Sequence, residues 1–119
     1  MLSQVNPEYV EIAEIWKEMQ KECETEECRR FARRILTSRS IREAMVYAFT
    51  AIAIDGAPCK LSDSDIEEIM KAFDNCVTDS IINQFIVAST LEDEELLEAL
   101  IDVIFDCAEK HVTKTFCSD

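Results

Sequence analysis

Residues 41–55, IREAMVYAFTAIAID, have almost no polar face when they are arranged as a helix. A helix that is apolar nearly all round is usually covered by other helices on most of its sides. Ser40 precedes the stretch and Glu43 follows three residues later, a pattern in which the serine accepts a hydrogen bond from an early N–H group of the helix. We therefore expect a central apolar helix over about residues 41–55, with the other helices packed around it.

The rest of the chain also carries helical patterns. Apolar residues recur every three or four positions, and one glycine and two prolines in 119 residues leave little turn chemistry for β-hairpins. The sequence predicts an all-α fold, a single compact bundle of five to six helices over residues 1–119, with a helix at about 26–36 and a loose tail at 113–119. The side chains predicted to cap helix starts are Asn6, Ser40, Ser64, Thr78 and Thr90.

Charge is distributed unevenly along the chain. Twenty-five acidic residues against twelve lysines and arginines give a net charge of -13. Residues 29–42 contain all six arginines and no acid, whereas residues 43–112 contain sixteen acids and three lysines. A surface this acidic repels nucleic acid and anionic membranes and favours basic partners.

The beginning of the chain, MLSQVNPEYVEIAEIW, lacks the basic and then apolar profile of a secretory signal, and the longest apolar run is about half a membrane span. We therefore expect a soluble cytoplasmic protein that does not enter membranes. No cysteines form a C-x-x-C pair. The six cysteines are interpreted as mainly reduced thiols that act as small hydrophobic residues, namely Cys23, Cys28, Cys59, Cys76, Cys107 and Cys117.

The pair Asp55 and Gly56 directly follows the apolar stretch and allows two interpretations. A glycine after a helix commonly adopts the left-handed conformation in which the chain leaves the helix, and Pro58 supports a stop at this point. Alternatively, Asp55 joins the acids of residues 63–68 in an oxygen-rich pocket for a hard divalent cation. An EF-hand loop is excluded, because DSDIEEIMKAFD has neither glycine at its sixth position nor glutamate at its twelfth.

The same region resembles the tellurite-resistance TerB-like family of small helical domains. In that family an apolar helix ends in an Asp-Gly pair, and the following helix opens with serine or aspartate and then an acid. Here the matching residues are AIAIDG at 51–56 and LSDSDIEEI at 61–69, within a resemblance that covers about residues 46–70. The resemblance implies a helical bundle and a divalent-cation site that uses Asp55 with Asp65 or Glu67. This chain differs in its longer loop and in having IFDCAEKH in place of a second Asp-Gly pair.

The sequence contains no arrangement typical of an enzyme. One glycine cannot form a glycine-rich phosphate loop or a G-x-S-x-G motif. His111, the only histidine, stands four residues after Cys107, so the two can share a helix face as a thiol and base or as half of a metal site. No further ligand stands at a readable spacing, and a position near the negative end of a helix also explains His111. We expect no catalysis and no cofactor, and the alternative interpretation of Asp55 adds a divalent cation.

The basic segment RRFARRILTSRSIR occupies residues 29–42. On a helix, like charges four residues apart destabilise each other unless an anion is near. One interpretation is that the arginines pair with acids of the chain, such as Glu26 and Glu43. The other is a patch that binds a phosphate backbone, an acidic partner or the acidic face of a second copy, which would make the protein a homo-oligomer or a subunit of a nucleoprotein complex. The patch consists of Arg29, Arg30, Arg33, Arg34, Arg39 and Arg42.

The run EDEELLEALID at residues 92–102 is typical of a solvated helix face. A sharper hypothesis is that its carboxylates imitate a phosphate row and occupy the basic groove of a nucleic-acid-binding protein. Small phage and viral inhibitors have a similar size and charge. The preferred hypothesis is a non-catalytic acidic helical protein, accessory or inhibitory, that binds a basic surface of a protein or nucleoprotein partner. The residues assigned to this surface are Glu92, Asp93, Glu94, Glu95, Glu98, Asp102 and Asp106.

Overall fold

The computed structural model describes residues 7–112, 116 and 117, with side chains from Ile12 onward. Over these residues the chain forms six α-helices, one short 3₁₀ helix and no strand, which confirms the predicted all-α bundle. In chain order the elements are α1 (Pro7–Glu22), α2 (Glu26–Ala32), η1 (Arg33–Thr37), α3 (Ile41–Gly56), α4 (Asp63–Cys76), α5 (Asp79–Thr90) and α6 (Glu94–His111).

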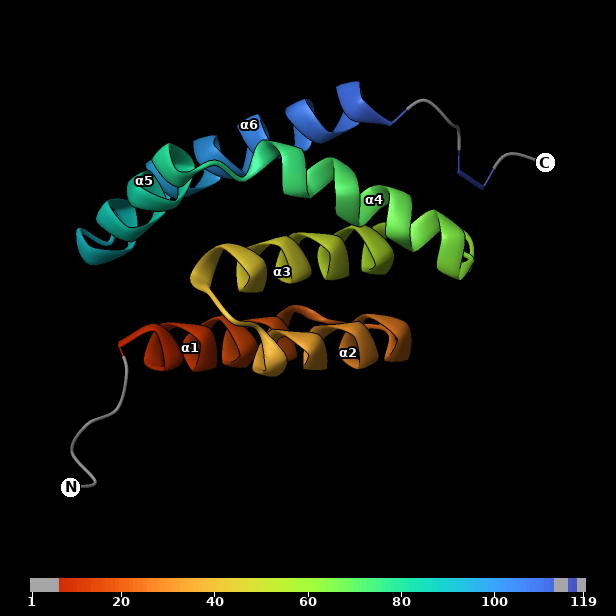
Figure 1. Cartoon of the computed structure of the whole chain (residues 1–119), viewed down its shortest axis with the longest axis horizontal. Coiled ribbons are helices and arrows are strands. Elements are labelled where there is room, and N and C mark those ends of the chain that lie inside the picture. The colour runs from red at the N-terminus through yellow and green to blue at the C-terminus, as the bar shows by residue number, and fades with distance from the viewer. Residues whose placement is uncertain (1–6, 113–115, 118–119) are drawn as a thin grey trace.

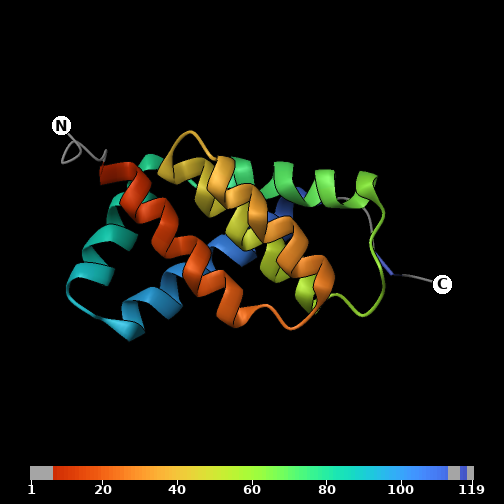
Figure 2. The same cartoon turned by 90° about the horizontal axis from the view of Figure 1, so that it is seen from below.

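α3 lies between two layers of helices (Figure 1). On one side it packs against α1, α2 and η1, and seen from below α1 and α2 lie side by side across it (Figure 2). On the other side it packs against α4 and, less extensively, α5, while α6 packs on α4 and α5. The predicted central position of this helix is therefore confirmed. The molecule is elongated, with principal extents of 55 × 27 × 22 Å.

The composition of α3 accounts for this position. Its buried residues are spread around the helix rather than along one stripe: Ala44, Met45, Val46, Ala48, Phe49, Thr50, Ala51 and Ile54. The only polar side chain among them is Thr50, which is fully buried and donates a hydrogen bond to the carbonyl oxygen of Val46 at 2.7 Å. The helix therefore presents no unsatisfied polar group to either layer, and both of its main faces contribute to the hydrophobic core.

Four phenylalanines join α3 to the helices of the second layer. Phe49 stacks on Phe73 with ring centroids 5.7 Å apart, and Phe105 meets Phe73 edge-on at 5.2 Å. Phe49 also contacts Phe85 and Phe105, each at 5.9 Å. Such offset and edge-to-face pairs add to the free energy gained by burial alone. The cluster connects α3, α4, α5 and α6 at a single point.

The predicted helix starts are partly confirmed. Ser40 caps α3 and Thr78 caps α5, as expected, and each side-chain oxygen accepts a backbone N–H at 3.2 Å. The cap predicted at Asn6 lies outside the described residues. The cap predicted at Ser64 is wrong, because α4 begins earlier with a capping box between Ser62 and Asp65.

Two further boundaries differ from the prediction. The cap predicted at Thr90 is wrong, because Thr90 belongs to the last turn of α5, where its hydroxyl donates to the carbonyl of Ile86, and Asp93 caps α6 instead. The helix expected at 26–36 is an α-helix only to Ala32 and continues as the 3₁₀ helix η1.

Gly56 does not adopt the expected left-handed conformation. α3 continues through Gly56, no described glycine has a positive φ, and the capping residue is Ala57 in an extended conformation. Pro58 gives the physical reason, because a proline disfavours the helical conformation of the residue before it. The helix therefore stops because of Pro58, and the conformational freedom of glycine is not needed.

The cysteines form three disulfides, so the interpretation of mainly reduced thiols is wrong. The pairs are Cys23–Cys28, Cys59–Cys117 and Cys76–Cys107, and no cysteine is free. The first links the end of α1 to α2, and the third links α4 to α6. Closing loops with sequence separations of 31 and 58 residues stabilises a fold by about 3 to 4 kcal/mol each in the chain-entropy account.

The expected loose tail lies mostly outside the described residues. Of residues 113–119, the structure describes Phe116 and Cys117; Phe116 packs against the hydrophobic core, and Cys117 is tied to Cys59 in the loop between α3 and α4. Among the described residues, no helix combines the length and apolar character needed to cross a bilayer.

The aromatic cluster generates the first prediction. Phe73 is 2% exposed, and Phe73→Ala should lower the free energy of unfolding by roughly 3–5 kcal/mol, because it leaves a cavity beside the rings of Phe49 and Phe105. Val103→Ala is the control, since Val103 is 54% exposed and its truncation should change stability by less than about 0.5 kcal/mol. Urea unfolding followed by circular dichroism measures both values, and equal losses would contradict this assignment of the core.

Candidate functional site

The acidic strip, defined as Glu92, Asp93, Glu94, Glu95, Glu98, Asp102 and Asp106, lies on the outer surface of the second layer. All seven side chains are exposed. Asp93 caps α6 by accepting the N–H of Leu96 at 3.1 Å, and Glu92 occupies the preceding turn with a φ of 55°. Leu100, Ile104 and Ala108 are the buried residues of α6. The helix is thus anchored along one side, and the carboxylates project from the other.

The spacing within the strip follows from helical geometry. Glu95, Glu98, Asp102 and Asp106 are three or four residues apart and share one helix face. At 1.5 Å of rise per residue, successive carboxylates are about 4.5 to 6 Å apart along the axis. The strip is therefore a regular row of anionic groups on a rigid element. Val103, 54% exposed, adds an apolar side chain beside this row.

No member of the acidic strip forms an ion pair with another described residue. The described residues form three ion pairs within 4.0 Å, namely Lys21 with Glu18, Arg29 with Glu26 and Arg42 with Asp74. None of them includes a member of the strip. All three lie near solvent, where each pair contributes at most about 1 kcal/mol. The predicted pairing of Glu26 with Arg29 is confirmed, whereas most of the acidic charge has no cationic neighbour in the described part of the chain.

The six arginines of the basic segment do not form one uniform patch. Arg29 pairs with Glu26, and the guanidinium of Arg34 lies 4.7 Å from the centre of the Phe31 ring. Arg33 and Arg39 are exposed. The predicted contact of Glu43 with Arg39 is made by the backbone N–H of Arg39. The basic segment is therefore divided among several local environments.

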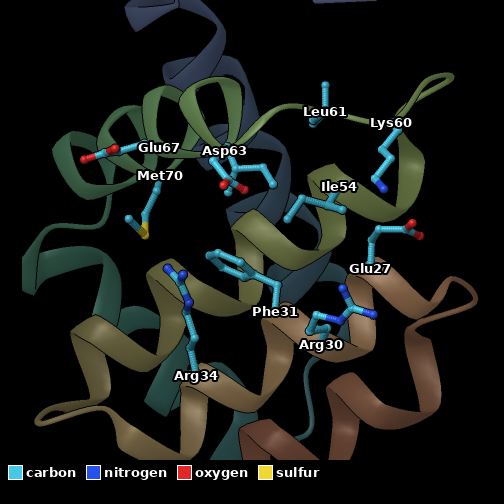
Figure 3. A pocket seen from close by; sticks show the side chains of 11 residues that line it. Glu27, Arg30, Phe31, Arg34, Ile54, Lys60, Leu61, Asp63, Glu67 and Met70 are labelled. Carbon is cyan, nitrogen blue, oxygen red and sulfur yellow. The ribbon is translucent and has the colours of Figure 1, made fainter.

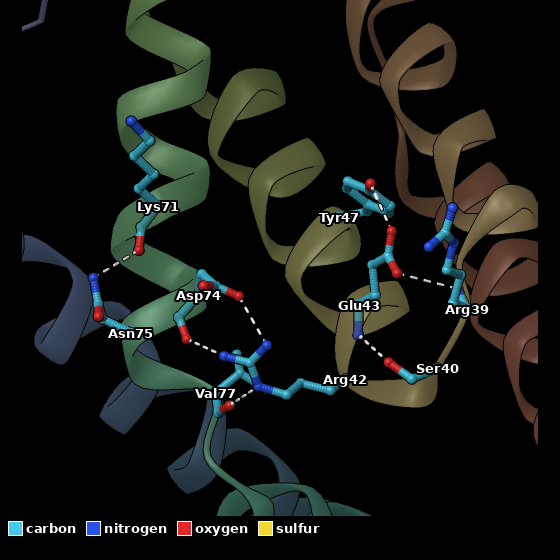
Figure 4. A network of polar contacts seen from close by, with 9 residues as sticks. All are labelled: Arg39, Ser40, Arg42, Glu43, Tyr47, Lys71, Asp74, Asn75 and Val77. Carbon is cyan, nitrogen blue, oxygen red and sulfur yellow. Dashed lines mark hydrogen bonds and ion pairs between the residues drawn. The ribbon is translucent and has the colours of Figure 1, made fainter.

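Arg42 has a structural role at the start of α3 (Figure 4). Its guanidinium pairs with the Asp74 carboxylate at 2.9 Å and donates to the backbone carbonyls of Asp74 and Val77. These carbonyls lie at the C-terminal end of α4, where backbone acceptors lack partners within the helix. Nearby, burial and a hydrogen bond to Glu43 raise the pKa of Tyr47 above its usual value. Arg42 thus connects α3 to α4 and is not available to a partner as fully as the sequence suggested.

Two of the other arginines, Arg30 and Arg34, line a cavity of about 510 Å³ between α2, η1 and α4 (Figure 3). Lys60 adds a third cation, and Phe31 is among its apolar lining residues. The carboxylates of Glu27, Asp63 and Glu67 line the same cavity. Because cations and anions are equal in number here, the cavity does not present the single sign of charge that selects a phosphate group.

The three predicted cation ligands are not brought together. Asp55 accepts hydrogen bonds from the backbone N–H groups of Glu24 and Thr25 and from the Thr25 hydroxyl, at 2.9 to 3.0 Å. Asp65 belongs to the capping box of α4, and Glu67 is exposed at the cavity described above. Asp55 therefore fastens the connection between α1 and α2 to the end of α3, a role that its position after the apolar helix did not reveal.

A different group of metal-binding side chains is brought together. In the part of the chain that the structure describes, Cys76, Cys107 and His111 are the only set of three or more whose ligand atoms all lie within 4.8 Å of one another. The sequence indicated the i, i+4 pair Cys107 and His111 on α6. It could not supply Cys76, which comes from the end of α4 and is distant in sequence.

The chain matches no protein-family model, no curated protein and no solved structure. The resemblance to TerB-like domains therefore stays a prediction.

Asp55 generates a stability prediction with a pH dependence. Burial raises its pKa, but the hydrogen bonds from Thr25 and Glu24 and the charge of Arg29 outweigh burial and hold the pKa below the ordinary value of 3.8. Asp55 therefore stabilises the fold above pH 3.8, and this stabilisation is lost as the pH falls through the lower pKa of the folded state. Asp55→Ala should lower the free energy of unfolding at pH 7 by about 1–3 kcal/mol, and the loss should shrink in acid.

Glu67→Ala is the matched control for Asp55→Ala. Glu67 is exposed and makes no hydrogen bond or ion pair with the described residues, so the change should be within about 0.5 kcal/mol. Chemical unfolding between pH 3 and 7, with and without a chelator, measures both variants. Equal losses that also depend on the chelator would support a shared cation site and contradict the structural role of Asp55.

Arg42 generates a third prediction. Arg42→Lys should lower the free energy of unfolding by about 1–2 kcal/mol, because a single ammonium group cannot serve three acceptors in the geometry of a guanidinium. Arg39→Lys, at an exposed position, should change stability by less than about 0.5 kcal/mol. Thermal and urea unfolding of both variants measure the difference, and a neutral Arg42→Lys would show that the connection to α4 contributes nothing.

Proposed function

We propose that the protein is a non-catalytic interaction protein whose acidic strip binds a basic surface of a protein or nucleoprotein partner. The observation that carries the proposal is that seven exposed carboxylates lie on one side of α6 and its preceding turn, and that none forms an ion pair with a described cation. A charge neutralised within the chain would be screened from a partner. These charges are instead exposed to solvent, where their potential reaches a partner over about a Debye length.

The rigidity of α6 supports this proposal. The helix is held by the buried side chains Leu100, Ile104 and Ala108 and by the Cys76–Cys107 disulfide to α4. Carboxylates on such a helix lose less conformational freedom on binding than carboxylates on a loose loop, so less of the interaction energy is spent on ordering. Charge of one sign also speeds the encounter with a basic partner and disfavours acidic ones.

The surface around the acidic strip also contains exposed apolar residues. Val103 lies beside the carboxylates on α6, and Leu91, 68% exposed, precedes them in the turn. Interfaces gain much of their affinity from a few apolar or aromatic contacts surrounded by polar groups. A partner with arginines or lysines around a small apolar spot would therefore fit this surface better than a uniformly charged polymer. Binding to a basic groove that otherwise holds nucleic acid follows the same chemistry, and the protein would then compete with the nucleic acid.

A pair of charge variants tests the proposal. The strip variant neutralises Glu95→Gln, Glu98→Gln, Asp102→Asn and Asp106→Asn, and the control variant neutralises Glu14→Gln, Glu18→Gln, Glu22→Gln and Glu27→Gln in the opposite layer. Each raises the net charge by four, from -13 to -9. Partners captured from the native host with wild-type protein are identified by mass spectrometry, and the affinity for the purified partner is then measured with both variants.

The strip variant should raise Kd about tenfold or more, because four contacts worth about 0.2–1 kcal/mol each are removed. The control should raise Kd by less than about threefold, because its charges lie on α1 and α2, on the opposite side of α3 from the strip. Binding by the wild type should weaken steeply between 0.05 and about 0.5 M salt. Equal effects of both variants, or salt-independent affinity, would contradict the proposal. Loss of binding only in Arg30→Gln/Arg34→Gln would assign the interaction to the basic segment instead.

A further inference from the structure

Cys76, Cys107 and His111 form a compact group at the junction of α4 and α6. Cys76 is the last residue of α4 and is 5% exposed, whereas His111 is the last residue of α6 and is exposed. Cys107 stands one helical turn before His111, is partly buried, and is joined to Cys76 by a disulfide. The ligand atoms of the three residues all lie within 4.8 Å of one another. The group thus runs from the protein interior to its surface.

This combination of donors is chemically specific. Two thiolates and one imidazole are the ligand types that bind zinc in proteins, and three protein ligands leave the fourth tetrahedral position open. While the two sulfurs are bonded to each other, they are not thiolates and cannot fill this role. The two chemistries of the cysteine pair are therefore mutually exclusive, and the redox state of the pair decides between them.

We propose that Cys76, Cys107 and His111 form a redox-gated binding site for a thiophilic divalent cation such as Zn²⁺, closed when the disulfide is formed and open when it is reduced. The inference does not rest on the proposed function of the acidic strip, and the site is distinct from the cation site that the sequence suggested at Asp55.

The reaction balances with a low-molecular-weight thiol as the reductant. One small thiolate attacks a sulfur of the Cys76–Cys107 disulfide, which frees one cysteine and leaves the other in a mixed disulfide. A second small thiolate attacks this mixed disulfide and frees the other cysteine. Two small thiol molecules thereby become one small disulfide, and the protein gains two thiols. Zn²⁺ then displaces one proton from each thiol, and two protons pass to solvent. The imidazole of His111 binds through a nitrogen lone pair. In the reverse direction a small disulfide takes two electrons from the thiolates, and the metal is released.

The residues around the Cys76–Cys107 pair favour both reduction of the disulfide and binding of the cation. Cys107 is partly buried, whereas Cys76 is 5% exposed, so Cys107 is the more accessible residue of the pair for a small thiol. Packing of α4 on α6, which includes the edge-on contact of Phe73 with Phe105, holds the two helices together when the disulfide is open. The strongly acidic exterior raises the local concentration of divalent cations.

The other two disulfides lack this arrangement. Cys23–Cys28 and Cys59–Cys117 join sulfurs as Cys76–Cys107 does, but neither pair belongs to a group of three ligand atoms within 4.8 Å among the described residues. The histidine is therefore the feature that separates the Cys76–Cys107 pair from two ordinary structural disulfides. It also provides a substitution that leaves every disulfide intact.

Zinc binding by the full-length chain tests the proposal. The oxidised protein, and the protein reduced with a phosphine under anaerobic conditions, are titrated with Zn²⁺ against a chromophoric chelator and with Co²⁺ as a spectroscopic probe. We expect one Zn²⁺ per chain after reduction and none before it, with thiolate charge-transfer and tetrahedral d–d absorption for Co²⁺. His111→Ala should weaken Zn²⁺ binding by about tenfold or more, because the loss of even an outer-shell partner of a zinc ligand costs 10–100-fold.

Two double variants complete the test. Cys76→Ser/Cys107→Ser should abolish the binding, and Cys59→Ser/Cys117→Ser, which removes another disulfide of the same chain, should retain it. The proposal is overturned if the reduced wild type binds no Zn²⁺, if His111→Ala binds as tightly as wild type, or if binding persists without Cys76 and Cys107.

Reduction also opens the other two disulfides and can destabilise the fold, so the Tm of the reduced protein is measured with and without Zn²⁺. A ligand that binds only the folded state raises Tm, so Zn²⁺ should raise the Tm of reduced wild type and have no effect on the oxidised protein. The increase should be smaller in His111→Ala, which alters an exposed side chain and leaves the core unchanged. A reduced chain that stays unfolded with Zn²⁺ present, or whose Tm does not move, also overturns the proposal.

Discussion

Burial of α3 on both of its faces is the constraint on which the rest of the structure depends. A helix with one apolar stripe needs one partner, but a helix that is apolar nearly all round needs partners on opposite sides. The chain satisfies this requirement with two layers, α1 and α2 with η1 on one side and α4, α5 and α6 on the other. Because each outer helix buries one stripe against its neighbours, its charged residues are left to face water. The anionic exterior and the apolar centre are thus two results of the same packing.

The charged residues near the two ends of α3 complete this packing. Arg42, in its first turn, reaches the C-terminal end of α4, and Asp55, in its last turn, holds the connection between α1 and α2. Each layer thus receives hydrogen bonds from one charged side chain of α3. The guanidinium of Arg42 satisfies backbone carbonyls of the second layer, and the carboxylate of Asp55 satisfies backbone N–H groups of the first. From the sequence both residues looked like members of functional sites, a basic patch and a cation site. Their hydrogen bonds link residues 30 to 35 positions apart, which no local pattern reveals.

The fold could be predicted from sequence to the extent that it depends on local patterns. The apolar run at 41–55, the S-x-x-E cap at Ser40 and the period of the other helices are local, and they gave the central helix and the all-α bundle. Exposure of Glu95, Glu98 and Asp102 also follows from helical spacing. The cap at Ser62 was missed because Ser64 offers the same pattern two residues later. The helical conformation of Gly56 was missed because the helix was expected to end at the glycine. Pro58 instead disfavours the helical conformation of Ala57, so the helix ends one residue later.

The disulfides could not be predicted for a different reason. Six cysteines allow fifteen complete pairings, and spacing alone does not choose among them. Disulfides persist in oxidising compartments and in the cells of hyperthermophiles, whereas the sequence predicted a cytoplasmic protein, and that location stays a prediction. The third member of the thiol and imidazole group was hidden in the same way, because only the packing of α4 on α6 brings Cys76 to His111.

The placement of the three disulfides has a mechanical consequence. Cys23–Cys28 joins α1 to α2, Cys76–Cys107 joins α4 to α6, and Cys59–Cys117 ties the end of the chain to the loop before α4. Each covalent cross-link lies to one side of α3, so each layer is cross-linked within itself. α3 is joined to the layers by its backbone connections and by noncovalent contacts such as the phenylalanine cluster and the hydrogen bonds of Arg42 and Asp55. A denaturant weakens these noncovalent contacts but leaves the cross-links in place, so unfolding should loosen the boundaries between α3 and the two layers before it disperses either layer.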